Sequence, residues 1–379
     1  MNIIIENIVK HPAGSGIIRT GFLILRAVRS LSMFNIAYYF YPMNPPDVPG
    51  YVTAAGRKGI SGFASGKESD IPLKIELLVD GQVINTTYAA QKIYYPFKYY
   101  GEFIGFYFPM KAVWNYINKR QKIEVHADGK PLKFRAGKRG NDLIPNYGNL
   151  QNNKDKSVKN ITVNISEGNL INKFGRIQPP RNTNSGWTSK VFSSFETANE
   201  LFEKEFGKKL YVFYGSLLGF AREGGIIPYD CDMDLAYFSE ENDAKRVRNE
   251  FYEIAEKLGS ERKDVLFSVS KINFPKMRIS VTPTWITPDG DFACTFAYVG
   301  DKYKVTRDDV LPLQKIVYEG YELNLPANPV NIVKYVYGRG WKYPDPGWKW
   351  LIEYKLRPEI FKARLTNSQV KKLNKIILR

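Results

Sequence analysis

Residues 211–238 constrain the fold more than any other part of this 379-residue chain, and their sequence is YVFYGSLLGFAREGGIIPYDCDMDLAYF. Residues 210–213 are aromatic or apolar and predict a short buried strand. Gly215-Ser216 then breaks the strand and leads into a helix over residues 217–222. Backbone N–H groups at a helix start point outward, and the helix dipole favours an anion there. The turn is therefore a predicted phosphate site.

Three aspartates follow this turn at alternate positions. In a strand of period two, Asp230, Asp232 and Asp234 would share one face. Such a row of carboxylates is unstable without a cation, and hard oxygen ligands suit Mg²⁺ or Mn²⁺. The alternative is an acidic strand edge in solvent. Met233 and Leu235 predict that the other face is buried, which together with the upstream turn favours a metal site.

The run from Gly215 to Leu235, GSLLGFAREGGIIPYDCDMDL, resembles the signature of the LicD/fukutin family, whose usual wording is G-T-L-L-G-x-x-R-x-G-x-I/F-I/P-P-W-D-D-D-I/L-D-I/V. Looser similarity continues in residues 311–313 (LPL), 317–326 (VYEGYELNLP) and 335–341 (YVYGRGW). The resemblance covers Ser185 to Pro346. It implies a nucleotidyltransferase-fold domain, with a mixed sheet and packed helices.

The resemblance also implies an activity. Members of this family move a phospho-substituent, such as phosphocholine or ribitol phosphate, from a CDP-activated donor to a glycan hydroxyl. Carried over by position, Gly215 and Ser216 would hold the donor phosphates and Arg222 would pair with phosphate. Asp232 and Asp234 would bind Mg²⁺ or Mn²⁺.

The chain departs from the family pattern in three places, of which the replacement of the usual tryptophan by Tyr229 is mild. Cys231 replaces the middle aspartate of D-D-D, and on the opposite strand face it should leave the metal site intact. The third carboxylate, which this fold supplies from a later strand, has only Asp289 and Asp291 as candidates in residues 278–299, and we assign it to Asp291. Asp230 then holds a water or a second metal ion, or serves as the general base if neither candidate reaches the metal.

Lys271, Lys276 and Arg278 lie on the strand pair expected after the aspartates. In this fold such cations are expected to face the donor's pyrophosphate. The alternative is that they are isolated surface charges.

The net charge of +17 predicts a surface that attracts polyanions, but charge does not choose among a nucleotide donor, an anionic glycan, nucleic acid and an acidic membrane leaflet. The resemblance favours a CDP-linked donor and a glycan acceptor, with no nucleic acid. His11 and His126 lie far upstream of the motif, which argues against a histidine-relay hydrolase, and Cys231 and Cys294 lack the spacing of a zinc site.

The chain shows no signal-peptide pattern and no apolar run near 18 residues, so we expect a cytoplasmic protein without a membrane span. Residues 17–31 mix arginines with apolar residues. They predict a helix that packs on its own domain or lies on a membrane surface, and the basic tail over residues 371–379 has the same two interpretations. Peripheral contact with the inner face of the membrane is therefore the closest membrane association we expect.

The first 140 residues predict an all-β sandwich that serves as a glycan-binding or accessory domain. Asp80-Gly81 and Asp128-Gly129 each separate two alternating runs, which is the hairpin pattern. The order of these runs resembles small β-sandwich modules appended to bacterial glycosyltransferases. The aromatic residues at 94–100 are expected to serve core and edge packing, or to stack on sugar rings.

Residues 141–184 are polar and rich in turn formers, which predicts a linker, and residues 185–379 form the predicted catalytic domain. Within it, apolar residues at three- and four-residue steps predict a helix over Ser189–Phe206, and a second helix is expected over residues 241–258. The predicted fold class is thus α+β, an N-terminal sandwich followed by a nucleotidyltransferase-fold domain.

Together these patterns predict a metal-dependent phosphotransferase that acts on a precursor of a cell-surface glycan such as a capsule or lipopolysaccharide. Two alternatives remain open. The first is a nucleotidyltransferase that acts on a small molecule or RNA, and the second is a glycan-binding protein whose catalytic domain has decayed. A glycosyltransferase of the D-x-D type has no reason to place Gly-Ser ahead of the aspartates in this way.

Overall fold

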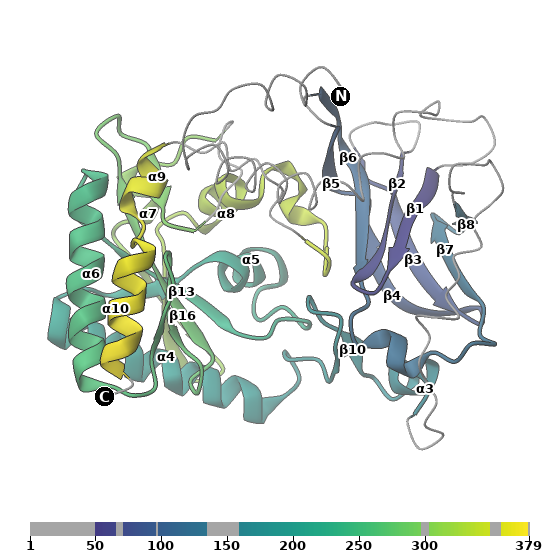
Figure 1. Cartoon of the computed structure of the whole chain (residues 1–379), viewed down its shortest axis with the longest axis horizontal. Coiled ribbons are helices and arrows are strands. Elements are labelled where there is room, and N and C mark those ends of the chain that lie inside the picture. The colour runs from purple at the N-terminus through teal and green to yellow at the C-terminus, as the bar shows by residue number, and fades with distance from the viewer. Residues whose placement is uncertain are drawn as a thin grey trace, which may run out of the picture.

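The computed structural model describes residues 50–65, 71–95, 98–134, 159–296, 303–348 and 358–377. Figure 1 shows two parts, a β-rich part formed by the N-terminal strands and a part of mixed sheet and helices formed by the C-terminal half. The segment around β10 lies between them. The predicted α+β class, with an all-β N-terminal part, is confirmed.

The N-terminal part consists of two sheets. The first has the order β5-β6-β2-β1-β9, with the bounds Gln91–Tyr95, Lys98–Pro109, Gly59–Ala64, Gly50–Gly56 and Lys133–Phe134. The second has the order β4-β3-β7-β8, with the bounds Gln82–Tyr88, Lys74–Val79, Ile123–Ala127 and Lys130–Pro131. Ile60 and Phe108 of the first sheet share one buried core with Leu77 and Val125 of the second. This shared core makes the pair a sandwich.

Both predicted Asp-Gly hairpins are present. Asp80 and Gly81 have φ of 50° and 78°, and Asp128 and Gly129 have φ of 45° and 75°. Two successive residues with positive φ define the turn type that matches the right-handed twist of paired strands, and Asp-Gly adopts it at little cost. The turns therefore fix the register of β3 with β4 and of β7 with β8.

A helix and a hairpin follow in the segment predicted to be a linker, residues 141–184. Helix α3 (Ile161–Ser166) begins at Asn160, whose side chain accepts a hydrogen bond from the N–H of Thr162. Strands β10 (Leu170–Ile171) and β11 (Ile177–Gln178) form a two-stranded antiparallel sheet. The residues closest to the catalytic domain are thus structured, whereas the predicted domain boundaries themselves stay a prediction.

The sheet of the C-terminal part has the order β12-β13-β16-β15-β14, with β17 paired to β16. The bounds are Leu210–Val212, Met233–Phe238, Ile279–Ile286, Ile272–Phe274, Leu266–Phe267 and, for β17, Phe292–Cys294. Strands β13 and β16 are parallel, and the other pairs are antiparallel. The start of β13, where the aspartates lie, is therefore next to the start of β16.

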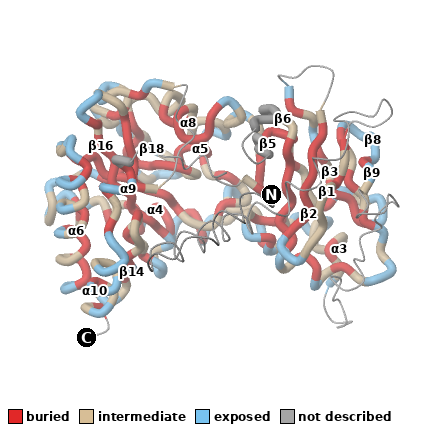
Figure 2. Tube along the Cα trace, turned by 45° about the horizontal axis from the view of Figure 1, so that its top comes forward, coloured by how far each residue is buried: buried red, intermediate tan, exposed pale blue. Residues whose placement is uncertain are grey.

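Helices cover this sheet, and a hairpin of β18 (Gln314–Tyr318) and β19 (Tyr321–Leu325) adjoins it. The described helices are α4 (Ser185–Phe206), α5 (Tyr214–Glu223), α6 (Ala244–Glu261), α7 (Arg307–Val310), α8 (Pro329–Tyr337), α9 (Pro358–Ala363) and α10 (Asn367–Ile377). Figure 2 shows the buried residues concentrated in the sheets and on the inner faces of these helices.

Helix α4 confirms the predicted amphipathic helix and begins four residues earlier. Val191, Phe195 and Phe202 are buried in the core of this domain. The side chain of Asn184 accepts a hydrogen bond from the N–H of Trp187 at 3.0 Å and so caps the helix start. The helix ends at Gly207, whose φ of 64° suits glycine.

Residues 17–31 and 136–158 lie outside the described residues, as do the side chains at residues 94–100. Of the basic tail, residues 371–377 are part of α10, and Leu373 and Ile377 are buried in the core of the C-terminal part. Among the described helices, none combines the length and the apolar character that crossing a membrane requires.

The two parts of the molecule are bonded to each other through Asp345. Its Oδ1 accepts hydrogen bonds from Thr87 Oγ1 and from the N–H of Gly347, both at 2.9 Å, and its Oδ2 accepts one from Gln91 Nε2 at 2.7 Å. A Cβ atom at Gly347 would lie 1.9 Å from the carbonyl oxygen of Tyr107 in β6. The sandwich and the C-terminal part are therefore packed tightly at this point.

Burial raises the pKa of Asp345 to about 6, although its three hydrogen-bond donors favour the ionised form. In the unfolded chain the pKa of an aspartate is about 4, so between these values the folded state binds more protons. The protonated Asp345 carboxyl therefore adds to the free energy of unfolding below pH 4, and this contribution is lost as the pH rises through 6. Between pH 4.5 and 7 the free energy of unfolding should fall by about 2 kcal/mol more in the wild type than in Asp345→Asn. Urea denaturation at the two pH values measures this, and equal pH dependence in both proteins would contradict it.

Candidate active site

The start of α5 and the start of β13 are held together by direct bonds. The N–H of Asp234 donates to Ser216 Oγ at 2.9 Å, and the N–H of Phe213 donates to the carbonyl oxygen of Asp234 at 2.8 Å. Helix α5 begins at Tyr214, so Gly215 and Ser216 lie in its first turn, where the backbone N–H groups have no intrahelical partners. The predicted phosphate turn therefore adjoins the aspartates.

Two of the aspartates, Asp230 and Asp234, converge in front of Gly215. A Cβ atom placed on Gly215 would lie 3.5 Å from Asp230 Oδ2 and 3.6 Å from Asp234 Oδ2. Asp230 and Asp234 are buried, whereas the side chain of Asp232 is 39% exposed. The absence of a side chain at Gly215 thus keeps open a space that two carboxylate oxygens and a helix start surround.

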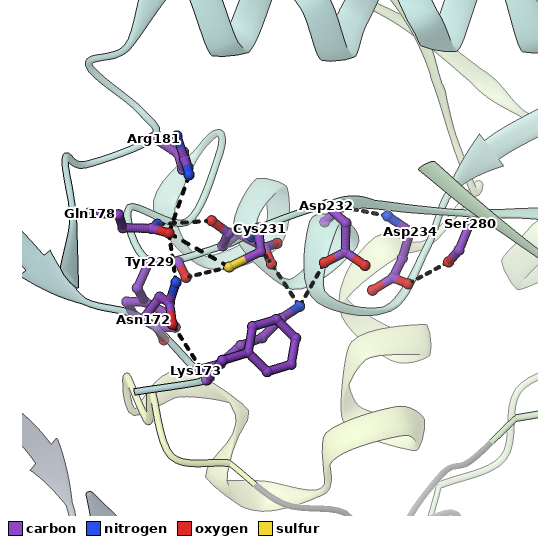
Figure 3. Close-up of polar contacts among 12 residues, drawn as sticks. Asn172, Lys173, Gln178, Arg181, Tyr229, Cys231, Asp232, Asp234 and Ser280 are labelled. Carbon is purple, nitrogen blue, oxygen red and sulfur yellow. Dashed lines mark hydrogen bonds and ion pairs between the residues drawn. The ribbon is translucent and has the colours of Figure 1, made fainter. Parts of the chain in front are cut away.

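Lys173, at the tip of the β10–β11 hairpin, joins two of these carboxylates. Its Nζ lies 3.0 Å from Asp230 Oδ1 and 2.8 Å from Asp232 Oδ1 (Figure 3). The side chain of Lys173 is one-third exposed. The hairpin therefore brings a cation from the predicted linker into the aspartate cluster.

Buried amide side chains fix this hairpin against the aspartate loop. Asn172 Nδ2 donates to Gln178 Oε1 at 2.7 Å, and Gln178 Nε2 donates to the carbonyl oxygen of Asp230 at 3.1 Å (Figure 3). Asn172 Oδ1 also accepts from the N–H groups of Phe174 and Arg176 in the hairpin turn. The position of Lys173 is thus determined by a bonded network rather than by its own salt bridges alone.

A second lysine contacts the third aspartate. Lys271 Nζ lies 2.7 Å from Asp234 Oδ1, to which Ser280 Oγ also donates at 2.9 Å. The ammonium group lies over the rings of Tyr214 and Phe296, 5.0 and 4.5 Å from their centroids. Asp234 is therefore held by an ion pair with Lys271 and by a hydrogen bond from Ser280, which lies on β16, the strand next to β13.

The pKa values of the cluster are displaced in different directions. Burial raises the pKa of Asp230, and Lys173 only partly offsets this. Burial acts in the same sense on Asp234, but Lys271 and Lys173 outweigh it and lower the pKa of that carboxyl. Burial lowers the pKa of Lys173, and the aspartates, Asp230 first, overcome this and raise it well above its usual value. Asp234 is thus the more strongly ionised carboxylate and Asp230 the more basic one.

The donor set fits a divalent cation. Each of the three aspartates uses Oδ1 for its contacts with protein, and within the described residues no Oδ2 has a hydrogen-bond partner. Three carboxylates against two ammonium groups leave one negative charge. Among the described residues, no three His, Cys, Asp or Glu side chains are arranged as a complete metal cage. Mg²⁺ does not require one, since it commonly takes one or two carboxylates together with substrate phosphates and water.

Only one of the three aspartates lies on the strand. Strand β13 begins at Met233, so Asp230 and Asp232 belong to the preceding loop, and the prediction that strand alternation places all three on one face is wrong. Cys231 is accordingly not on an opposite strand face. Its Sγ lies 3.7 Å from Gln178 Oε1, within the network that supports the hairpin.

Asp291 is not brought to the cluster. Its carbonyl oxygen accepts a hydrogen bond from the N–H of Thr287, just beyond the end of β16, whereas Asp234 pairs with Ser280 near the start of that strand. At about 3.3 Å per residue, seven residues of extended chain separate the two ends by about 23 Å. The position beside Asp234 holds a serine hydroxyl and an ammonium group instead of a third carboxylate.

Arg222 does not face the phosphate turn. Its guanidinium donates to the carbonyl oxygens of Trp341 and Tyr343 and to Tyr229 Oη, and its side chain is only 8% exposed. Arg222 therefore links the end of α5 to the segment that contains Trp341 and Tyr343, which we call the C-terminal loop. We drop its predicted role in binding phosphate.

Lys276 and Arg278 lie in the exposed turn between β15 and β16. The carbonyl oxygen of Arg278 accepts a hydrogen bond from the N–H of Met233, which places this turn beside the aspartate loop. Within the described residues, neither cation is paired with an aspartate of the cluster. Their contact with a donor pyrophosphate stays a prediction.

Lys173 is the site residue that sequence reasoning missed. The only signal was the apolar pair Leu170-Ile171 and the single apolar residue Ile177, on either side of a turn that contains Asn172 and Gly175. Such short strands are weak in isolation, and the polar composition around them indicates a loop. Only the packed structure shows where the hairpin points.

Replacing Lys173 by methionine tests its contribution. Without the ammonium group, Asp230 and Asp232 lose their shared partner and the site loses a positive charge for an anionic donor. We expect turnover of a CDP-linked donor to fall roughly a hundredfold, as when other fixed electrostatic groups are removed. Lys159→Met is the matched control, because Lys159 is exposed and, among the described residues, its ammonium group pairs with Glu167 and with no aspartate of the cluster. Turnover by Lys173→Met within twofold of the control would refute a role for Lys173.

Comparison with known proteins agrees with this geometry. Residues 207–328, which contain β12, α5, β13 and β16, match the family described as LicD/FKTN/FKRP, nucleotidyltransferase domain. A search of curated proteins found no match. The matched segment contains Gly215, Ser216 and the three aspartates. The chain is therefore similar to the LicD/FKTN/FKRP family over residues 207–328.

Proposed function

We propose that this protein is a divalent-metal-dependent phosphotransferase that moves a substituted phosphate from a CDP-activated donor to a hydroxyl of a cell-surface glycan precursor. The match of residues 207–328 to the LicD/FKTN/FKRP family supports a phosphotransferase-type activity on glycans in general. The observation that carries the finer proposal is the convergence of Asp230 Oδ2 and Asp234 Oδ2 on the space in front of Gly215, at the start of α5. Carboxylates bind divalent cations, and the N-terminus of a helix binds phosphate, so the two together can bind a cation and a phosphate side by side.

Asp232 and Asp234 would hold the metal ion, Mg²⁺ or Mn²⁺. The ion would neutralise charge on the donor phosphates and so favour departure of the nucleotide.

The chain's own cations and backbone groups would orient the donor. The N–H groups of Gly215 and Ser216 would face its phosphates, and the ammonium group of Lys173 would add positive charge at the exposed side of the cluster. Phosphoryl transfer depends mainly on positioning and charge stabilisation, which these groups supply.

Asp230 would receive the proton of the glycan hydroxyl. With Asp291 out of reach, it is the carboxylate of the cluster whose raised pKa suits a general base, and its Oδ2 faces the space in front of Gly215. Its proton acceptor atom would be Oδ2, because Oδ1 is engaged with Lys173 and with the N–H of Cys231.

A thermal-shift experiment with CDP, with and without Mg²⁺, tests the proposal. A ligand present at about 100 times its Kd stabilises the native state by about 2.7 kcal/mol, which should raise the melting temperature by several degrees. The shift should require Mg²⁺ and should disappear in Asp232→Asn. A shift of equal size without Mg²⁺, or none in its presence, would count against the proposal.

One observation favours a second candidate, a protein that binds glycan without catalysing transfer. Ser280 and Lys271 occupy the strand position where the fold usually supplies a third carboxylate. A protein of this kind would bind sugar but would show no donor turnover and no dependence on Mg²⁺.

A further inference from the structure

A groove lies where the sandwich meets the C-terminal part. Its volume is about 450 Å³, within the range of small-molecule sites. Strand β4 forms one wall, the α3–β10 segment forms a second, and Tyr229, Pro344 and Pro346 form the third. The groove exists only because the two parts are docked, and the buried bonds of Asp345 with Thr87 and Gln91 hold them in place.

The lining of the groove is uncharged. Among the described residues that form it, the side chains are those of Val, Ile, Leu, Pro, Tyr, Asn and Thr, without Asp, Glu, Lys or Arg. A site for a nucleotide or a phosphorylated ligand would be expected to offer cations, and this chain has 55 lysines and arginines to supply them. The groove therefore suits a neutral ligand that has both apolar faces and hydrogen-bonding groups.

One amide in this wall has an unused donor. Asn85 Nδ2 is buried and has no hydrogen-bond partner within the described residues, while Asn85 Oδ1 accepts from the N–H of Thr86 at 2.9 Å. A buried donor without a partner is costly. Rotation of this half-buried side chain toward the groove, which Asn85 lines, would let a ligand hydroxyl satisfy the donor. The ring of Tyr88, paired with that of Tyr343 at 5.4 Å between centroids, adds an aromatic wall of the kind that packs against the C–H face of a sugar.

The groove is also linked to the aspartate cluster. Tyr229, which lines it, directly precedes Asp230. Arg222 donates to Tyr229 Oη at 3.2 Å and to the carbonyl oxygens of Trp341 and Tyr343, so one side chain holds this wall and the C-terminal loop together. A molecule bound in the groove would therefore lie close to the loop that carries the catalytic carboxylates.

We propose that this groove is the acceptor subsite and binds a neutral pyranose unit of the glycan, with Asn85 donating to one of its hydroxyls. This inference rests on the proposed function, whose acceptor class it makes specific. It also assigns a task to the sandwich, which contributes β4 to the subsite.

Saturation-transfer NMR on the full chain, without donor or metal, tests this inference. The probes are the methyl glycosides of glucose, galactose, mannose and N-acetylglucosamine, with glucose 6-phosphate and CMP as anionic comparators. Asn85→Leu removes the donor at similar size, and Asn169→Trp fills the groove from a half-exposed position. Asn115→Leu is the control, because Asn115 is exposed and does not line the groove. Melting temperatures establish that all variants are folded.

We expect at least one neutral glycoside to bind the wild type and Asn115→Leu, with affinity about tenfold or more weaker in Asn85→Leu and Asn169→Trp. The inference is overturned if no neutral glycoside binds the wild type, if both groove variants bind as the control does, or if an anionic comparator displaces the sugar. The CDP and Mg²⁺ shift, measured on the same samples, separates the two proposals. Asp232→Asn should lose that shift and keep sugar binding.

Discussion

Replacing Asp234 by asparagine is expected to lower transfer about a thousandfold, the upper end of the effects of removing one preorganised electrostatic group. Asp234 is the buried carboxylate whose pKa Lys271 and Lys173 lower, so it stays ionised at the start of β13. Asparagine keeps the size of the side chain and can still accept from Ser280, which should preserve the fold. Donor turnover and a melting curve of the same sample measure the two effects.

Asp291→Asn is the matched control for this variant. It makes the same chemical change in the same domain, but at the opposite end of β16. We expect wild-type turnover from it. A large loss in Asp291→Asn, or turnover near the wild-type rate in Asp234→Asn, would show that the aspartates at the start of β13 are not the catalytic group.

Replacing Gly215 by alanine should cost about a hundredfold in turnover without loss of stability. The added methyl group would lie 3.5 to 3.6 Å from two carboxylate oxygens, an ordinary contact distance, so the native fold can accept it. The methyl group would nevertheless occupy the space that we assign to cation and phosphate, and small displacements of reacting groups have effects of about this size. Alanine also restricts the unfolded chain, which should hold or raise the melting temperature.

Gly186→Ala serves as the control for the glycine substitution. Gly186 lies in the first turn of another helix, α4, where an added Cβ would meet only Asn184 Oδ1 at 3.8 Å. Both alanine variants should melt at or above the wild-type temperature, and only Gly215→Ala should lose activity. Full activity in Gly215→Ala would mean that the space in front of this residue is not used.

Local patterns in the sequence predicted the scaffold well. The Asp-Gly turns fixed two hairpins because backbone with positive φ selects such residues, and the apolar repeat at 191–202 predicted α4 because only one face of it is buried. The Gly-Ser turn predicted the junction of β12 and α5 for a similar local reason. Each of these features depends on residues close together in the chain.

The parts of the site that sequence reasoning missed depend on contacts between distant segments. Alternation from Asp230 to Asp234 indicated a strand, but the first two aspartates form a loop whose shape is set by Lys173 and Gln178, more than 50 positions upstream. Asp291 is the nearer match to the family pattern because Phe292 follows it. The pairing of β17 with the far end of β16, however, places Asp291 away from the aspartate cluster. Such pairings cannot be deduced from residue spacing within one segment.

The most direct test of the whole account is an anomalous-scattering measurement on a crystal grown with Mn²⁺ and CDP. We predict one strong manganese peak within bonding distance of the carboxylates of Asp232 and Asp234, with the diphosphate of CDP at the N–H groups of Gly215 and Ser216. A manganese peak elsewhere, or CDP bound away from the start of α5, would contradict the central claim.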